Sequence, residues 1–273
     1  MNDYISLLIV GSLLLVSAAA ATGSNNQISV DIHQEAKGNC VTGNVYVDQE
    51  TYAVANVQGD DNYVSQHIDA YADNNDLTGI KNLPAGITQI CSIIGNITGN
   101  DNHLEQNMET NLRNNSIVES SISQLATQKA EIVGSDNSVY QSTSVDSCDN
   151  KLTLSSLSQS SSLGVSCSTC NNNWVDQRVS LSTNHSSLVG SKLWQVVTDS
   201  ANLSGSKNNI DQQATISSNN ARLTCAVENQ EILENANIHG SGNSVIHDLT
   251  LNGVTNKVVV GSLIQKANIT TNL

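Results

Sequence analysis

The residues that could do chemistry in this chain are six cysteines, six histidines and dispersed acidic residues. The most specific spacing among them is Cys167-x-x-Cys170. As half of a zinc site, this pair would need a second close pair of Cys or His residues, and the sequence supplies none. As a thioredoxin-type redox pair, it would need a βαβ context, which is also missing. We therefore interpret the motif as a structural disulfide.

The histidines and acidic residues show no pattern typical of an active site. His67 and His103 fall in segments of alternating polarity, at positions that we expect to face solvent. Serine, histidine and aspartate are common, and nothing marks one set of them as an activated triad. Asp101 and Asp136 fall at predicted turns, but the Gly/Asp spacing of calcium-binding nonapeptide repeats is absent. The sequence therefore predicts no enzyme activity, no metal site and no cofactor.

Composition narrows the class of partner. The formal net charge is −14 and the sequence pI is near 4.5. With only 11 Lys and Arg residues, the chain is a poor candidate for binding nucleic acid or an anionic membrane. A β-helix polysaccharide lyase or hydrolase would gather acids with Lys or Arg along one groove, and no such column recurs at a fixed offset. That enzyme class is the least favoured alternative.

A repeated motif organises the chain. Its anchors are the turn glycines Gly23, Gly59, Gly99, Gly134, Gly205 and Gly240, with Cys170 in the glycine position of the fifth repeat. Successive anchors are 36, 40, 35, 36, 35 and 35 residues apart. A fixed period in this range indicates a repeat architecture. The longest interval contains the only proline, Pro84, and we interpret it as a loop insertion.

Each repeat places amide side chains at fixed distances from its anchor. Asn follows the anchor by three residues and tolerates the left-handed backbone of a tight turn. Gln follows by seven residues in five repeats, between mostly aliphatic columns. Since residues two apart on a strand face the same way, these side chains would stack into a ladder of bonded amides. The predicted ladder comprises Asn62, Gln66, Asn102, Gln106, Asn137, Gln141, Asn173, Gln177, Asn208, Gln212 and Asn243.

The repeat predicts an all-β fold, a parallel β-solenoid (β-helix) of about seven repeats of 35–36 residues. About three short strands per repeat would stack in parallel at a spacing of ~4.8 Å. Segments 112–129 and 228–235 also fit a helical pattern locally. The period does not decide whether each repeat forms one large coil or two smaller ones. A second turn is marked by Asn39, Asn75, Asn115, Asn150 and Asn256.

The N-terminal segment predicts export. Residues 1–21 combine an apolar run with small residues that end at Ala21, which is the pattern of a cleaved secretory signal peptide. The run is too short for a comfortable membrane span, although a retained anchor is the alternative. We therefore expect a signal peptide over 1–21 and a secreted protein at the cell surface. The repeat domain would cover 22–273, with repeats that start near residues 23, 59, 99, 134, 170, 205 and 240.

An exported chain can form disulfides and be glycosylated. The connectivity of an even set of cysteines is not fixed by sequence, and intermolecular pairing is also open. The disulfide candidates are Cys40, Cys91, Cys148, Cys167, Cys170 and Cys225. The N-glycosylation candidates are Asn96, Asn114, Asn184, Asn202 and Asn268.

The pattern Gly-x-x-Asn-x-aliphatic-x-Gln, from Gly23 onward, resembles two groups of structural proteins. It is similar to curlin-type functional-amyloid subunits, whose repeats have Gly-Asn turns and stacked Gln and Asn. It resembles more closely the Asn/Ser-rich β-solenoid proteins of methanogen (archaeal) cell-surface sheaths and fibres, which combine a signal peptide, cysteines and an acidic composition. The resemblance implies an extracellular structural polymer without an active site, in which the glycines and amides serve stacking.

The resulting hypothesis is a secreted subunit that self-assembles into a cell-surface sheath, fibre or surface layer. Neither terminal repeat is a distinct polar cap, and an uncapped sheet edge is a template for another chain. The expected partner is a second copy of the chain, followed by other components of the cell envelope. We expect no binding to nucleic acid, and no contact with a membrane beyond the signal segment. The main alternative is a monomeric surface adhesin or carbohydrate-binding solenoid, and the polysaccharide lyase or hydrolase is the third.

Overall fold

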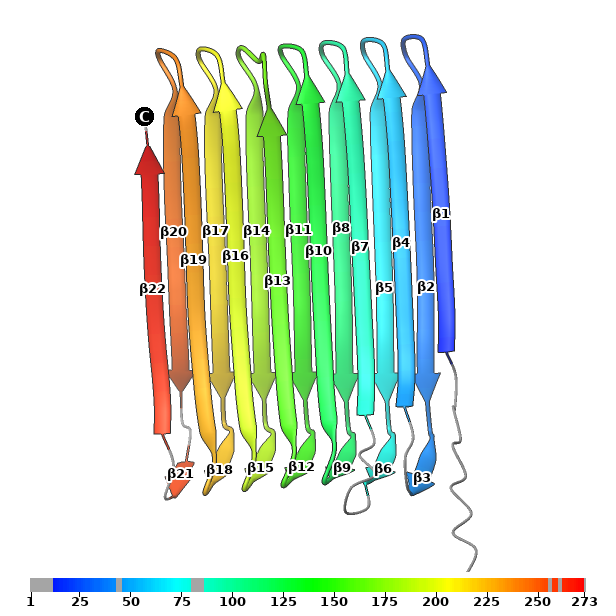
Figure 1. Ribbon diagram of the computed structural model, residues 1–273, viewed down its shortest axis with the longest axis vertical. Helices are drawn as coiled ribbons and strands as arrows, with labels where there is room; N and C mark the ends of the chain where they lie inside the picture. The colour runs from blue at the N-terminus through cyan, green and yellow to red at the C-terminus, as the bar shows by residue number, and fades with distance from the viewer. Residues whose placement is uncertain (1–11, 43–45, 80–85, 255–256, 260–261, 273) are drawn as a thin grey trace, which may run out of the picture.

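The computed structural model describes residues 12–42, 46–79, 86–254, 257–259 and 262–272, and every regular element in them is a β-strand. The strands form three parallel sheets, which we name A, B and C. Each repeat forms one coil, with a long strand in sheet B, a short strand in sheet C and a long strand in sheet A (Figure 1). The prediction of a parallel β-solenoid is confirmed, and one large coil per repeat is the arrangement adopted.

Sheet A has eight strands, and sheets B and C have seven each. The strands of sheet A are β1 (Ser12–Thr22), β4 (Tyr46–Gln58), β7 (Gly86–Thr98), β10 (Ser121–Val133), β13 (Ser156–Cys167), β16 (Lys192–Ser204), β19 (Val227–His239) and β22 (Ser262–Asn272). Those of sheet B are β2 (Gln27–Lys37), β5 (Tyr63–Asp73), β8 (His103–Arg113), β11 (Ser138–Cys148), β14 (Trp174–Asn184), β17 (Asn209–Asn219) and β20 (Ser244–Val254). Those of sheet C are β3 (Cys40–Thr42), β6 (Asp76–Thr78), β9 (Ser116–Val118), β12 (Lys151–Thr153), β15 (Ser187–Val189), β18 (Arg222–Thr224) and β21 (Lys257–Val259).

Two of the three strands in each coil are long, which corrects the expectation of three short strands. A sheet A strand such as β4 has 13 residues and a sheet B strand such as β5 has 11, whereas β6 of sheet C has three. The alternation of buried and outward positions continues through Gln, Ser and Thr residues. Their polarity conceals the strand period in the sequence. Segments 112–129 and 228–235 also belong to strands, so the local helical pattern was misleading.

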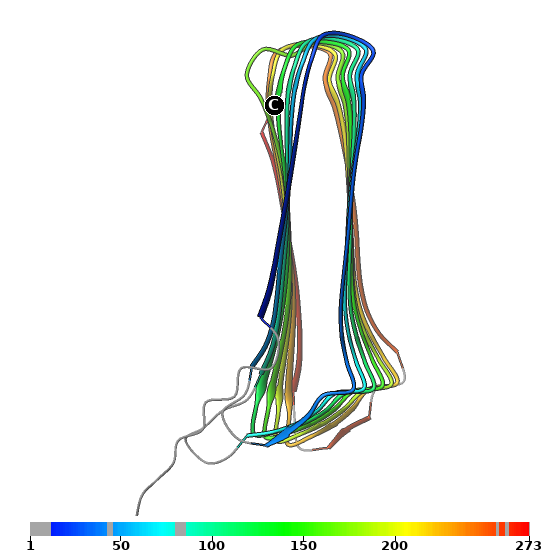
Figure 2. The same ribbon diagram turned by 90° about the vertical axis from the view of Figure 1, so that its right-hand side faces the viewer.

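Sheets A and B face each other as two walls (Figure 2). The buried side chains of both sheets fill the interior between them. In cross-section, the turns from sheet A to sheet B close one end of each coil, and sheet C closes the other. Aliphatic side chains of neighbouring coils stack in register, as Val64, Leu104 and Val139 do, and all three are buried. Burial of such columns is the main favourable contribution to the free energy of folding, at roughly 25 cal/mol per Å² of apolar surface removed from water.

The turn from sheet A to sheet B requires glycine. All six predicted turn glycines have positive φ values, between 102° and 144°. A Cβ atom on Gly134 would lie 2.0 Å from the carbonyl oxygen of Gly99 in the preceding coil. The turns of successive coils are therefore too close for a side chain. One turn, in the yellow-green part of the chain near Cys170, stands out from the stack (Figure 2).

Three predictions fall wholly or partly outside the described residues. The segment 1–11, the loop around Pro84 and the turn residue Asn256 are not described. The rest of the predicted signal peptide forms β1, which pairs in register with β4 along its whole length. Cleavage near Ala21 stays a prediction. In the ranges that the structure covers, no helix has the length and apolarity to cross a membrane.

Candidate functional site: stacked amide columns

Five glutamines of sheet B form a hydrogen-bonded column in the interior. Each lies in register with the next, and each is buried. From Gln106 onward, the side-chain nitrogen of each donates to the side-chain oxygen of the glutamine one coil earlier, over 2.8–3.1 Å. Buried amides are tolerable when they are bonded in this way. The members are Gln66, Gln106, Gln141, Gln177 and Gln212.

The sheet B column is interrupted at both ends. Val30 lies in register before Gln66, and His247 lies in register after Gln212. The buried oxygen of Gln212 has no hydrogen-bond partner among the described residues. His247 instead contacts Glu234 through Nδ1 at 2.7 Å and Thr271 through Nε2 at 2.9 Å. The histidine therefore ends the amide column without extending it.

A second, longer glutamine column lies in sheet A, and the sequence analysis missed it. Its side chains follow the same donor order over 2.7–3.0 Å. The signal was present, because most of these glutamines precede a turn anchor by ten residues, as Gln89 precedes Gly99. The members are Gln49, Gln89, Gln124, Gln159, Gln195, Gln230 and Gln265.

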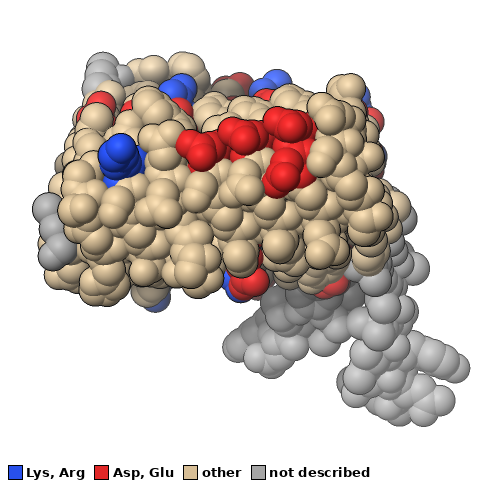
Figure 3. All heavy atoms as spheres, turned by 90° about the horizontal axis from the view of Figure 1, so that it is seen from above, with Lys and Arg blue, Asp and Glu red and all other residues tan. Residues whose placement is uncertain are grey.

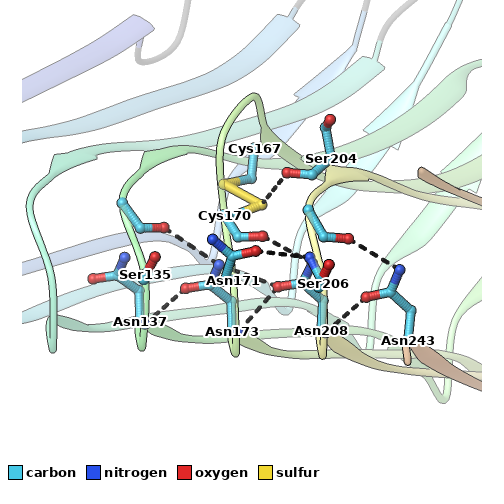
Figure 4. The surroundings of a disulfide bond; sticks show 12 residues. Ser135, Asn137, Cys167, Cys170, Asn171, Asn173, Ser204, Ser206, Asn208 and Asn243 are labelled. Carbon is cyan, nitrogen blue, oxygen red and sulfur yellow. Dashed lines mark hydrogen bonds between the residues drawn. A yellow bond between two sulfur atoms is a disulfide. The ribbon is translucent and has the colours of Figure 1, made fainter. Parts of the chain in front are cut away.

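The turn asparagines form a third column, shown in part in Figure 4. The backbone N–H of each donates to the side-chain oxygen of the asparagine one coil later, over 2.7–3.1 Å. This direction is opposite to that of the glutamine columns. The left-handed backbone falls one residue earlier, as at Asp61, Asp101 and Asp136, so the expectation of a left-handed asparagine was wrong. The asparagine side chains instead satisfy backbone donors that the turn leaves without a strand partner. The members are Asn26, Asn62, Asn102, Asn137, Asn173, Asn208 and Asn243.

The second turn also has a stack of asparagines, but it extends over fewer coils. Asn39, Asn75 and Asn115 each donate through the side chain to the next asparagine, over 2.8–2.9 Å. The column then changes type, because the backbone of Asn150 donates to the hydroxyl of Ser186 at 3.4 Å. Serine is shorter and bonds at longer range, so the amide stack ends there.

Two of the six candidate cysteines are joined. Cys167 and Cys170 form a disulfide across the displaced turn, with Cα atoms 6.0 Å apart (Figure 4). Cys91 is buried, and desolvation raises the pKa of its thiol to about 12. The structure leaves three further thiols unpaired at or near the surface, those of Cys40, Cys148 and Cys225. The disulfide thus closes the turn in which cysteine replaces glycine.

Acidic side chains line the Gly-Asn turns at one end of the section (Figure 3). Asp60, Asp61, Asp101 and Asp136 are exposed there. In the described part of the chain, three potential metal ligands converge only at Cys148, Asp149 and His185, a partly exposed group on another turn. Burial and the neighbouring Asp149 raise the pKa of the Cys148 thiol to about 11, which disfavours the thiolate that a metal requires.

Three acids, Asp199, Glu228 and Glu234, are buried in the interior. Asp199 is fully buried in β16, and neither of its oxygens has a hydrogen-bond partner in the described structure. It lies in register with Leu163 on one side and Glu234 on the other. Burial raises the pKa of Asp199 well above its ordinary value and raises that of Glu234 to about 8. Desolvation lowers the pKa of His247, so burial opposes charge on both members of the Glu234–His247 pair.

The remaining candidates lie at the surface. Asn114, Asn202 and Asn268 are exposed, and Asn96 and Asn184 are half-buried. Of these, Asn96, Asn184 and Asn202 are already bonded to asparagines of adjacent coils. His67 and His103 are outward-facing and partly exposed, as the alternation predicted.

Comparisons with known proteins complete this description of a parallel β-solenoid. No protein-family model, no curated protein and no solved structure matches the chain. The candidate function therefore has to be argued from the columns and from the strands at which they end.

Proposed function

We propose that this protein is a secreted structural subunit that assembles end to end into a sheath, fibre or surface layer. The observation that supports the proposal is that the sheet A glutamine column continues to β22, a strand with an unpaired edge in the described structure. In the described structure β22 pairs only with β19, and all 11 of its residues are exposed. An exposed strand edge presents unpaired N–H and C=O groups to another chain.

The chemistry of the end favours a copy of the same chain. β22 presents Leu263, Ile264 and Ile269, which are 38%, 42% and 48% exposed. Gln265 continues the sheet A amide column to this strand. A second copy offers strands with matching aliphatic and amide columns at the same spacing. Cross-β stacking of this kind is very stable because each coil satisfies the next.

Electron microscopy and fibre diffraction of the secreted material test the proposal. Assembly predicts filaments or sheets with a reflection near 4.8 Å along the solenoid axis. Sedimentation of the same sample over a hundredfold dilution measures whether the particles persist. A protein that stays monomeric at every concentration would refute self-assembly.

A surface-bound carbohydrate binder is the second candidate. Trp174 and Trp194 are 50% and 51% exposed, and exposed aromatic rings stack on sugar faces. A glycan-binding screen on unassembled protein tests this function. The variant W174A/W194A is the matched control. A glycan signal that the parent gives and the variant lacks would assign binding to these rings. Absence of any glycan signal would remove this candidate.

A further inference from the structure

We propose that β1 blocks end-to-end stacking, and that its removal or displacement lets β22 of a second copy take its place on β4. This inference rests on the proposed function and identifies the step that controls it. Figure 1 places β1 and β22 at opposite ends of the stack. Both belong to sheet A, which has eight strands where sheets B and C have seven.

The strand count makes the two ends incompatible while β1 is in place. If β22 of one copy paired with β1 of the next, sheet B would have a vacant strand position between β20 and β2. Sheet C would have another between β21 and β3. Each vacancy would leave main-chain groups unpaired and open the interior to water. Without β1, each sheet has seven strands, and β20, β21 and β22 meet β2, β3 and β4 together.

The register shows that β22 matches the position of β1. Ala20 of β1 pairs with Asn56, and Asn272 of β22 pairs with Asn237. Asn56 and Asn237 are connected through successive register partners in every intervening coil. β22 thus occupies the same part of the coil as β1. Asn272 of a docked copy would therefore lie beside Asn56, where Ala20 lies in the single molecule.

β22 also matches the amide column of β4 better than β1 does. The register partner of Gln49 in β1 is Leu13, so the amide column has no glutamine on that side. A docked β22 would place Gln265 there. Gln265 donates to Gln230 at 2.7 Å, which turns its oxygen toward the next coil. Gln49 would supply the donor that every other glutamine of the column supplies.

The turn asparagines provide the opposite donor at the same junction. Asn243 accepts from the backbone of Asn208 at 2.8 Å, so its own backbone N–H faces the next coil. Asn26 begins the column and donates to Asn62, so its side-chain oxygen faces the preceding coil. Each end face therefore has one donor and one acceptor column, and the two faces are complementary in one orientation only.

One charged pair would form across the junction. Glu50 of β4 and Lys266 of β22 lie at equivalent positions along sheet A. A docked copy would place them side by side on the outer surface. In a single molecule they are separated by all the intervening coils. Exchange of their charges therefore tests the contact without touching the interior.

The first experiment displaces β1 in the full chain. S17P/A18P removes two adjacent backbone donors from β1 and disfavours its pairing, whereas S17T/A18V keeps a strand-forming sequence at the same positions. We expect at least a tenfold shorter lag for assembly of S17P/A18P, measured by light scattering and micrographs, with S17T/A18V like the parent. Equal assembly of all three proteins would overturn the role of β1 and leave self-assembly intact. No assembly by any of them, including material recovered with a processed N-terminus, would count against the proposed function itself.

The second experiment exchanges charges in the S17P/A18P background. E50K and K266E each place like charges together at the junction, and we expect each to slow elongation severalfold at low salt. E50K/K266E restores an opposite pair and should recover the parent rate, with the differences shrinking at high salt. Additive slowing by the two changes would show that these residues do not meet and would overturn the proposed register.

Discussion

The buried side chains of this protein are unusual for the number of amides among them. Gln141 and Gln177 are fully buried, and their amides are bonded to each other at 2.9 Å. An amide can donate to one neighbour and accept from the other, which a carboxylate cannot do. The column therefore depends on the amide group and not only on the shape of the side chain.

Replacing both glutamines with glutamate tests this dependence. Q141E/Q177E would place two adjacent charges in the interior and remove the donors to Gln106 and Gln141. We expect a loss of roughly 3 kcal/mol or more of unfolding free energy at pH 7. The loss should shrink at pH 4, where protonated carboxyl groups donate again. Urea unfolding measures it, with exposed Gln58→Glu as the control. Equal stability of both variants would mean that the column is solvated.

The buried Asp199 is expected to reduce stability. Its folded-state pKa is raised by burial, so the folded protein retains a proton that the unfolded chain loses as pH rises. The contribution to stability is therefore most favourable below the ordinary pKa of aspartate and is lost as pH rises toward the folded value. D199L restores the aliphatic side chain found at Leu163, one coil earlier. We expect a gain of about 1–4 kcal/mol at pH 8 and a smaller gain at pH 4.

Urea unfolding at both pH values measures this effect. Asp76→Leu, at an exposed position of β6, controls for added surface hydrophobicity. A destabilising effect of D199L at pH 8 would show that Asp199 has a favourable partner in the folded protein.

At the scale of the element, the turns define the coil more strictly than the strands do. The strands accept Ser, Thr, Ala, Val and Ile at equivalent inward positions. The turn from sheet A to sheet B has a glycine of positive φ in six coils, and in five of them a Cβ would lie within 2.2 Å of the preceding turn. The reason is the close approach of one turn to the next. Only the coil that has the Cys167–Cys170 disulfide departs from this rule, and its turn is displaced (Figure 2).

The variant G134A tests the close approach. Its Cβ would lie 2.0 Å from the carbonyl oxygen of Gly99, and its φ of 134° is strained for alanine. We expect a loss of about 3 kcal/mol, measured by thermal or urea unfolding. Gly164→Ala is the matched control, because its nearest neighbour would be the Ser200 hydroxyl at 3.6 Å. Equal effects of the two changes would contradict a steric requirement at the turn.

At the scale of the whole molecule, the ends determine what the solenoid can do. The interior columns close every coil against its neighbours and leave β22 with one free edge in the described structure. A docked copy would cover Ile269, which lies at the register position equivalent to Ala53 of β4. The apolar side chains at this end therefore occupy positions that are interior in the other coils but have no further coil to cover them in the described structure.

The variant I269K tests this reading of the end face. A lysine would put an unpaired charge against the apolar face of the docked copy, so we expect assembly to fall at least tenfold in rate. The isolated molecule should keep its unfolding free energy within about 0.5 kcal/mol, since the site is exposed. Ile264→Lys, on the outward side of the same strand, should assemble normally. Sedimentation and micrographs measure both, and normal assembly of I269K would place the contact elsewhere.

The sequence by itself determined the period, the parallel solenoid and the sheet B amide column. The anchors recur at a fixed period, and glutamines such as Gln66 follow most of them by seven residues. When the coils stack, residues at the same offset lie one above another and form a column. The sheet A column also has a fixed offset, ten residues before most anchors, but it was not predicted. Exposed and inward positions were predictable because strands alternate their faces.

Only the tertiary structure decided how many coils a repeat forms, because one large coil and two small coils share the same period. It also decided that Asp199 and Glu234 face the interior and that Ser12–Thr22 pairs with β4. These outcomes depend on which strands pair, and strand pairing joins residues that are far apart in the sequence. Composition does not specify those pairs. The matching of β22 to the site held by β1 is likewise a property of register, which exists only once the coils are stacked.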